Sequence, residues 1–539
     1  MKAIKNIMIA LSGIALLASC DMDKFFELDR PESNPWLSVD DLEYSVADPY
    51  NTLFQNPNWQ APIGIIPYYQ ELVADLSTVN PQGAYEQEAL YWYPRQMSTF
   101  DVTGQQFEKT FSILYRSVTG ATSPLTYIEE KEKKGEPVFA NMTENDKKTL
   151  ARQTGELYFM RGYTYWLISR AFVAPYDPAG GEGNNRKFIP LINRLDYSQE
   201  SARNPYMGTV KEVYDQMLSD FAKAKSLMPE DYFVRGRANK FSAAMMLMRV
   251  KWLMGDKDGA LEEADYVITK AEAGVAPFDL TEEPIVAFNR NAEQQYTVDP
   301  VSKEVMFECA FTESNQGNNV AIPLARMCKT GIYNFKSKTF DASNKLWLEG
   351  ARGSQNWQHG GWACAYWNPR LIKYIGWAVT DDPMDLTNYV PSAEALADKR
   401  FTQLHYFLKN YTDGGDKTIH EMAYNKTKWN AFWNDKYYRA PYGKYSQVPL
   451  IRLAEAYLTR ATLVLSKNVS QALGDVNKIR QRAGLTPLKN VTEADIEKER
   501  IKEFGFENGD RLLYLVAMQK TIDGQKRNPG AVYDNPNTD

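Results

Sequence analysis

The amino-acid sequence predicts a mainly α-helical fold in which helices pair into hairpins and irregular loops connect them. Three observations support this prediction. Apolar residues recur at helical spacing in several segments, two of these segments resemble each other, and proline and glycine interrupt the stretches between them. The chain has 539 residues, of which 44% are hydrophobic and 24% are charged, so it has enough apolar material for a large core.

The N-terminus, residues 1–19, has the pattern of a bacterial export signal. Two lysines precede a mostly apolar run, residues 7–18, which is too short to span a membrane and has the length of a signal-peptide core. The run ends in Leu-Ala-Ser-Cys, which resembles a lipobox, so we expect Cys20 to carry lipid and attach the chain to a membrane. The alternative is an ordinary signal peptide with a chance cysteine. Residues 20–44 are expected to form a tether, and its acidic start is either a solvated spacer or a sorting signal.

The rest of the chain, residues 45–539, is expected to form one domain, with an N-terminal part up to about residue 280 and a C-terminal part after it. Residues 20–100 contain many prolines and asparagines and predict irregular structure. Helical stripes of apolar residues then follow at 155–172 and 209–228.

Residues 241–270 align with residues 451–480 when a two-residue gap is placed in the turn. Each segment predicts a helix, a short polar turn and a second helix, with small residues at matching positions. This is the pattern of a degenerate tetratricopeptide-like hairpin, and the alternative is chance similarity between amphipathic helices. Because a lone hairpin cannot bury its apolar face, the pattern predicts one continuous stack.

Five segments occur in an order that is typical of one protein family: GELYFMRGYTYWLISRAF (155–172), TVKEVYDQMLSDFAKAKSLMP (209–229), VPLIRLAEAYLTRA (448–461), ALGDVNKIRQRAGL (472–485) and IEKERIKEFGFENGDR (496–511). Together with the lipobox they resemble the SusD/RagB family, and they span most of the mature chain. One departure is the sequence after Gly509, which reads Asp-Arg-Leu-Leu-Tyr-Leu where many members have an Arg-Trp-x-Asp-Leu type of sequence. That region is structural in the family, so the departure concerns local packing.

The resemblance implies a surface-exposed lipoprotein of the outer membrane that faces the cell exterior. Its fold would be a unit of tetratricopeptide-like hairpins with irregular ligand-binding loops. Such proteins act as hinged lids over a SusC-like TonB-dependent transporter barrel and capture glycans, or peptides in some branches, without catalysis.

The segment 347–377 holds five of the twelve tryptophans of the chain. Trp357, Trp362 and Trp367 are five residues apart, which matches neither a helix stripe nor one face of a strand, and glycines break regular structure nearby. These rings are therefore expected on a loop, either as a supporting core or as a ligand platform. A platform is chemically reasonable because an aromatic ring buries the C–H face of a sugar while neighbouring polar groups bind its hydroxyls. The candidate polar groups are Asn356, Gln358, His359 and Arg370.

A second aromatic cluster lies in the N-terminal part of the chain. It contains Tyr91, Trp92 and Arg95, and it follows Asp75, which resembles the aspartate of the family's N-terminal segment, near which ligand contacts often lie. Trp59 is a further candidate. The aromatic segment 428–445 leads directly into the helix at 448 and is interpreted as structural.

Composition and motifs argue against several other functions. A net charge of −6 does not favour nucleic acid, and three histidines and four cysteines without paired spacing favour neither zinc nor any other metal or cofactor. Cys309, Cys328 and Cys364 are interpreted as buried hydrophobes, and the acidic segment 380–388 as a solvated loop rather than a calcium site. Nucleophile-elbow, phosphate-loop and zinc-protease motifs are absent from the sequence.

The sequence therefore predicts a glycan-binding uptake lipoprotein that is not an enzyme. Two alternatives remain: a peptide-capturing member of the same family, and a lipid-anchored glycosidase, since two suitably spaced carboxylates are enough for glycoside hydrolysis.

Overall fold

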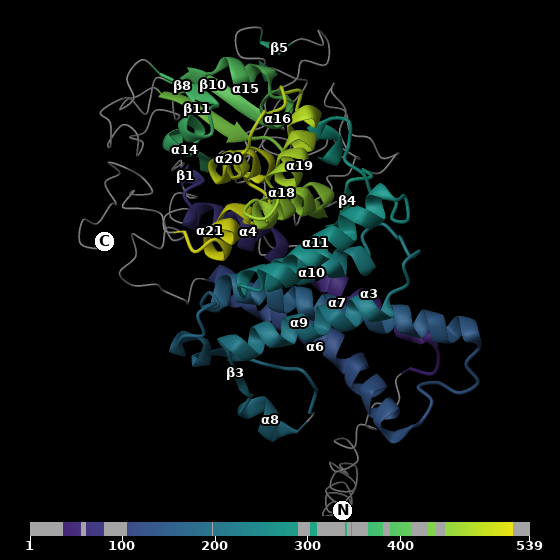
Figure 1. Ribbon diagram of the computed structural model, residues 1–539. Helices are drawn as coiled ribbons and strands as arrows, with labels where there is room; N and C mark the ends of the chain where they lie inside the picture. Colours follow the sequence, from purple (N-terminus) through teal and green to yellow (C-terminus); the bar gives the residue numbers. More distant parts are fainter. Residues whose placement is uncertain are drawn as a thin grey trace, which may run out of the picture.

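The computed structural model describes residues 36–54, 61–79, 105–196, 198–288, 302–309, 340–341, 346–347, 365–380, 389–411, 429–437 and 448–520. Helices make up most of this part of the chain, which confirms the predicted fold class (Figure 1). The strands are short and pair two by two.

A stack of helices forms the centre of the molecule, and each helix packs on the next (Figure 1). In order, the stack consists of α6 (Gln105–Lys134), α7 (Glu144–Phe172), α9 (Val210–Leu227), α10 (Lys240–Leu253), α11 (Lys257–Glu272), α18 (Leu453–Val464) and α19 (Val469–Arg482). Because α11 packs directly on α18, the stack continues across the border expected near residue 280.

Both predicted hairpins form, as α10 with α11 and as α18 with α19. Asn239 caps α10 by accepting hydrogen bonds from the backbone N–H groups of Phe241 and Ser242 at 3.0 and 2.9 Å. The turn to α11 uses Gly255 at φ +82°, a conformation that glycine adopts without steric cost. Asp256 then caps α11. The hairpins are consistent with a tetratricopeptide-like repeat.

Helix α10 lies between α9 and α11 and is buried on nearly all sides. Met245, Met248 and Leu253 have no exposed surface, and Trp252 has almost none. A helix in the middle of a stack has neighbours on several sides, which explains why apolar residues surround this one.

Two helices lie in the N-terminal segment that was expected to be irregular. They are α3 (Val39–Phe54), which packs on α6 and α7, and α4 (Pro62–Val73). Pro62 occupies the first turn of α4, where the missing N–H has no helical partner to lose. Helix α3 begins at Val39 and Leu42 is fully buried, so packed structure is present before the boundary expected at residue 44.

Six two-stranded sheets connect the helices of the described residues. The strands are β1 (Ser77–Val79) with β7 (Ala365–Trp367), β2 (Lys187–Pro190) with β3 (Met207–Thr209), β4 (Val305–Cys309) with β12 (Val448–Arg452), β5 (Phe340–Asp341) with β6 (Leu346–Trp347), β8 (Ala378–Val379) with β9 (Val390–Pro391), and β10 (His405–Tyr411) with β11 (Trp429–Asn434). Cys309 is a buried free cysteine, as predicted, and Trp433 is fully buried, which supports the structural interpretation of that aromatic segment. Cys328, Cys364 and residues 381–388 lie outside the described residues.

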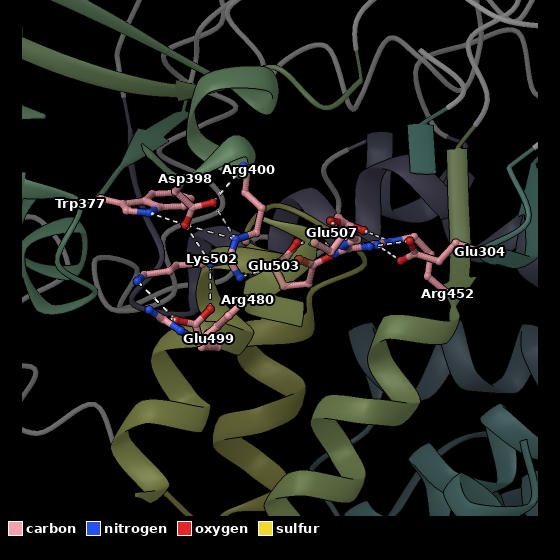
Figure 2. A network of polar contacts seen from close by, with 12 residues as sticks. Glu304, Trp377, Asp398, Arg400, Arg452, Arg480, Glu499, Lys502, Glu503 and Glu507 are labelled. Atoms are coloured by element: carbon pink, nitrogen blue, oxygen red, sulfur yellow. Dashed lines mark hydrogen bonds and ion pairs between the residues drawn. The ribbon is translucent and has the colours of Figure 1, made fainter. Parts of the chain in front are cut away.

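Buried ion pairs join the C-terminal helix α20 (Glu493–Phe504) to α16 (Lys399–Leu404) and to the β4–β12 sheet (Figure 2). Arg452 on β12 contacts Glu304 at 2.5 Å and Glu503 at 3.0 Å. Arg400 contacts Glu499 at 2.8 Å, and its neighbour Asp398 at the same distance. Removing one partner of such a pair would leave a buried charge without compensation, so the network strongly disfavours other arrangements of these elements.

Candidate functional site

The pairing of β1 with β7 brings together the two parts of the chain that hold most of the candidate ligand residues. The strands are antiparallel, with Ser77 opposite Trp367 and Val79 opposite Ala365. The last residue of β1 therefore lies beside the first residue of β7. We call this ladder and its flanking helix α14 (Pro369–Tyr374) the β1–β7 edge.

Asn368 connects both sides of this edge to each other. Its backbone N–H donates to the carbonyl oxygen of Leu76 at 2.9 Å, and its Nδ2 donates to the carbonyl oxygen of Asp75 at 2.9 Å. Its Oδ1 accepts a hydrogen bond from the N–H of Arg370 at 3.0 Å and so caps α14. Asn368 thus fixes the start of β1 and the start of the helix that follows β7.

Asp75 also connects the edge to the C-terminal helix α21 (Asp510–Ala517). Nε and Nη2 of Arg511 donate to its two carboxylate oxygens at 2.6 and 2.8 Å, and Nη1 of Arg511 donates to Glu497 on α20 at 2.6 Å. Burial by itself would lower the pKa of Arg511, but the hydrogen bonds and charges of Asp75 and Glu497 outweigh it and raise the pKa above its ordinary value.

Trp367 is a core residue, because none of its surface is exposed. Its ring lies 5.5 Å from that of Trp377 and 5.2 Å from that of Phe506, both in edge-on arrangements. A ring enclosed in this way cannot stack on a ligand. For Trp367, the structure therefore favours the supporting core that the sequence had left open and contradicts the platform. The region around it also contains regular structure, β7 and α14, where only a loop was expected.

Two further residues of α14 are partly exposed to solvent. Arg370, a sequence candidate, is half-buried at the start of the helix. Tyr374, which the sequence did not single out, is 41% exposed, and the ammonium group of Lys498 lies 5.1 Å from the centre of its ring. The spacing of these two residues along one short helix was a signal that could have identified Tyr374.

The other candidates lie outside the described residues: Trp59, Tyr91, Trp92, Arg95, Asn356, Trp357, Gln358, His359 and Trp362. Cys20 also lies outside them. Their roles as ligand contacts and lipid anchor stay predictions.

Two acids at the edge, Asp75 and Glu497, are paired with cations. Glu497 is buried, which raises its pKa, but hydrogen bonds from Lys520 and Arg511 outweigh this and keep the pKa below its ordinary value. A general acid in glycoside hydrolysis needs the opposite shift, so Glu497 is not suited to that role. Within the described ranges, acids, histidines and cysteines do not gather into a cluster that could hold a metal ion. In the same ranges, the helices are too short or too polar to cross a membrane.

Two family models match the chain in succession. A model described as "Starch-binding associating with outer membrane" matches residues 57–251, and a model of the SusD family matches residues 303–512. Among curated proteins, "SusD-like protein P2" of Formosa agariphila is 25% identical over 373 residues, which is 67% of this chain and 62% of that protein. The chain thus spans less than two thirds of this relative. The starch-binding protein SusD of Bacteroides thetaiotaomicron is 42% identical over 67 residues, 12% of each chain.

Solved structures share the fold. A SusD-like carbohydrate-binding protein from Bacteroides vulgatus superposes with a TM-score of 0.62 at 16% identity, covering 90% of this chain and 85% of that one. Surface glycan-binding protein A from Bacteroides uniformis gives a TM-score of 0.57 at 16% identity, with 91% and 90% covered. At such low identity, these matches support the arrangement of the helices and strands.

Proposed function

Because this chain belongs to the SusD family, we propose that it is a glycan-binding lipoprotein of the outer-membrane surface. In this proposal it captures an oligosaccharide or polysaccharide and passes it to a partner TonB-dependent transporter, while lipid on Cys20 holds it to the membrane. It binds the glycan without cleaving it.

The pairing of β1 with β7 is the observation that carries the proposal. In the sequence, the aromatic segment with Tyr91 and Trp92 follows β1, and the segment with Trp357 and Trp362 precedes β7. Arg370 and Tyr374 lie on the helix that follows β7. Aromatic faces together with hydrogen-bonding side chains are the chemistry that recognises sugars. Trp357 and Trp362 are the proposed stacking rings, and the neighbouring polar residues are proposed to select among sugars.

A glycan panel tests this proposal. Binding of the full chain to maltoheptaose, laminarihexaose, xylohexaose, mannohexaose and trigalacturonic acid would be measured by calorimetry, together with the variants Trp357→Ala and Trp362→Ala. The matched control is Tyr206→Ala, since Tyr206 is an exposed ring beside β3 rather than at the β1–β7 edge. We expect binding of at least one class, weakened by the tryptophan variants and unchanged in the control.

Two results would contradict the proposal. Binding of peptides but of none of the glycans would favour the peptide-capturing alternative. Shorter products after prolonged incubation with a bound glycan, in proportion to the amount of protein, would favour the glycosidase.

A further inference from the structure

We propose that Asp75 and Arg511 are positioning residues, whose ion pair holds the β1–β7 edge against α20 and α21 and thereby sets the affinity for the ligand. This inference rests on the proposed function. It concerns two residues that need not touch the ligand, and it assigns a binding role to a part of the C-terminal motif that the sequence had marked as structural only.

The geometry places Asp75 between two parts of the molecule. Its carbonyl oxygen accepts from Asn368, on the side of β7, and its carboxylate accepts from Arg511, on the side of α21. Arg511 in turn donates to Glu497, so the edge is tied to both α20 and α21. With side-chain exposures of only 7% for Arg511 and 18% for Asp75, the pair is shielded from water and bidentate, which is the favourable geometry for an ion pair.

The pair is one of several links between the segment that leads into β1 and the C-terminal helices, and its partners are 436 positions apart. A neighbouring link is the N–H of Gly509, which donates to Glu71 at 3.2 Å, while the hydroxyl of Ser77 donates to the carbonyl oxygen of Glu71. The C-terminal helices are therefore linked to β1 through Glu71 and through Asp75.

Support of this kind affects affinity through preorganisation. If the β1–β7 ladder adopts several positions in the free protein, the ligand binds only the molecules in which the ladder is in the binding-competent position. The apparent affinity is then reduced in proportion to the fraction of such molecules. Asp75→Asn removes one charge and one strong acceptor but keeps the side-chain volume. Arg511 keeps Glu497 as a partner, so the variant does not leave it without a counter-charge.

The chain offers a matched control with nearly the same chemistry. Arg460 donates through Nε and Nη2 to Asp475 at 2.8 and 2.6 Å, and through Nη1 to a second acid, Asp265, at 3.1 Å. This pair joins α18, α19 and α11 inside the helical stack. Asp475→Asn therefore removes an equivalent bidentate partner from another place in the fold.

The experiment compares the parent chain, Asp75→Asn and Asp475→Asn by two measurements. Amide hydrogen exchange reports on peptides that cover residues 77–79 and 365–367, and calorimetry reports the affinity for whichever of the five oligosaccharides the parent binds. For Asp75→Asn we expect faster exchange in both strands and an affinity about tenfold lower, the effect of losing one charge-assisted hydrogen bond. For Asp475→Asn we expect an affinity within about twofold of the parent, even if its melting temperature falls as much as that of Asp75→Asn.

Asp75→Glu, which restores the carboxylate, should recover part of the affinity, whereas a general loss of stability would not respond to it. Equal losses of affinity in Asp75→Asn and Asp475→Asn would overturn the positioning role, and so would unchanged exchange and affinity in Asp75→Asn. A parent chain that binds none of the oligosaccharides would contradict the proposed function instead, and the exchange rates alone would then decide whether the pair holds the ladder.

Discussion

The indole ring of Trp367 lies directly against Gly505, between the end of α20 and the start of α21. A Cβ atom on residue 505 would stand 2.8 Å from Cζ2 of the ring and 2.9 Å from the carbonyl oxygen of Ile501. Real Cβ atoms do not come this close to a rigid ring or to backbone, so the glycine is what allows the C-terminal helices to reach the β1–β7 edge.

Gly505→Ala is therefore expected to destabilise the protein by about 1–3 kcal/mol through overpacking. Denaturant unfolding of the full chain measures this loss. Gly474→Ala is the control, because Gly474 lies inside α19 with open space around its missing Cβ. That change should stabilise the protein by about 0.5–1 kcal/mol, since alanine favours a helix more than glycine does. Equal effects in the two variants would show that crowding against Trp367 is not the cause.

Trp367→Ala should reduce stability rather than ligand contact. Removing a large buried ring costs about 3–5 kcal/mol, and any loss of binding should follow from unfolding. Trp357→Ala and Trp362→Ala are expected to do the reverse: nearly unchanged melting, and an affinity about ten- to a hundredfold lower. Thermal melting and calorimetry on the same samples separate these outcomes. Normal melting together with normal binding in the last two variants would place the site elsewhere.

Acid should unfold the protein by protonating the network of Figure 2. Burial raises the pKa of Glu499, but the charges of Arg400, Lys502 and Arg480 outweigh it and lower the pKa from 4.5 to about 2. The pKa of Glu503 is lowered in the same way, chiefly by Arg482 and Arg452. A carboxylate with a lowered folded pKa stabilises the fold above pH 4.5, and this stabilisation disappears as the pH falls from 4.5 to about 2. Unfolding free energies measured across that range should fall steeply, and a flat profile would contradict this account.

Glu71 should have the opposite effect on the pH dependence of stability. It is fully buried, its Oε2 has no hydrogen-bond partner among the described residues, and burial together with the charge of Asp510 raises its pKa well above 4.5, despite nearby Lys436. A group with a raised folded pKa destabilises the fold progressively as the pH rises from 4.5 towards that value, by at most about 1.4 kcal/mol per pH unit. Glu71→Gln, which cannot ionise, should therefore gain stability relative to the parent between pH 5 and pH 8 and match it near pH 4. Parallel stability curves for the two proteins would refute this.

Cys20→Ala is expected to block lipidation, because the sulfur is the proposed attachment point. The variant should remain unprocessed or leave the membrane fraction. Mass spectrometry of the mature N-terminus is the direct measurement, and an unmodified Cys20 in the parent protein would contradict the lipobox interpretation.

Local pattern was sufficient to predict most of the helices. Residues 209–228 have one apolar face, the hairpins at 241–270 and 451–480 resemble each other, and α9, α10, α11 and α19 begin with capping residues, so neighbouring residues carry the signal for these helices. Helices α3 and α4 were missed because their prolines were interpreted as breakers. Pro62 is compatible with the first turn of α4, whereas Pro49 and Pro67 lie inside the two helices.

Local pattern was much less sufficient to predict the candidate site. Spacing marked Trp357, Trp362 and Trp367 as one group, and burial separates Trp367 from any surface role. Whether a ring is core or platform depends on what packs against it, and here the packing residues, Trp377, Gly505 and Phe506, include two that are far away in the chain.

The sequence by itself determined the class of the fold, the helical hairpins and the family, because each of these is encoded in short-range spacing and in motifs that keep their order. Only the tertiary structure decided that β1 pairs with β7 and that Arg511 binds Asp75. The physical reason is that a charged residue has the same local appearance whether it faces water or a partner. Its partner depends on how the packed helices bring distant segments together. In this protein, the packing brings Arg511 on α21 to Asp75 at the β1–β7 edge.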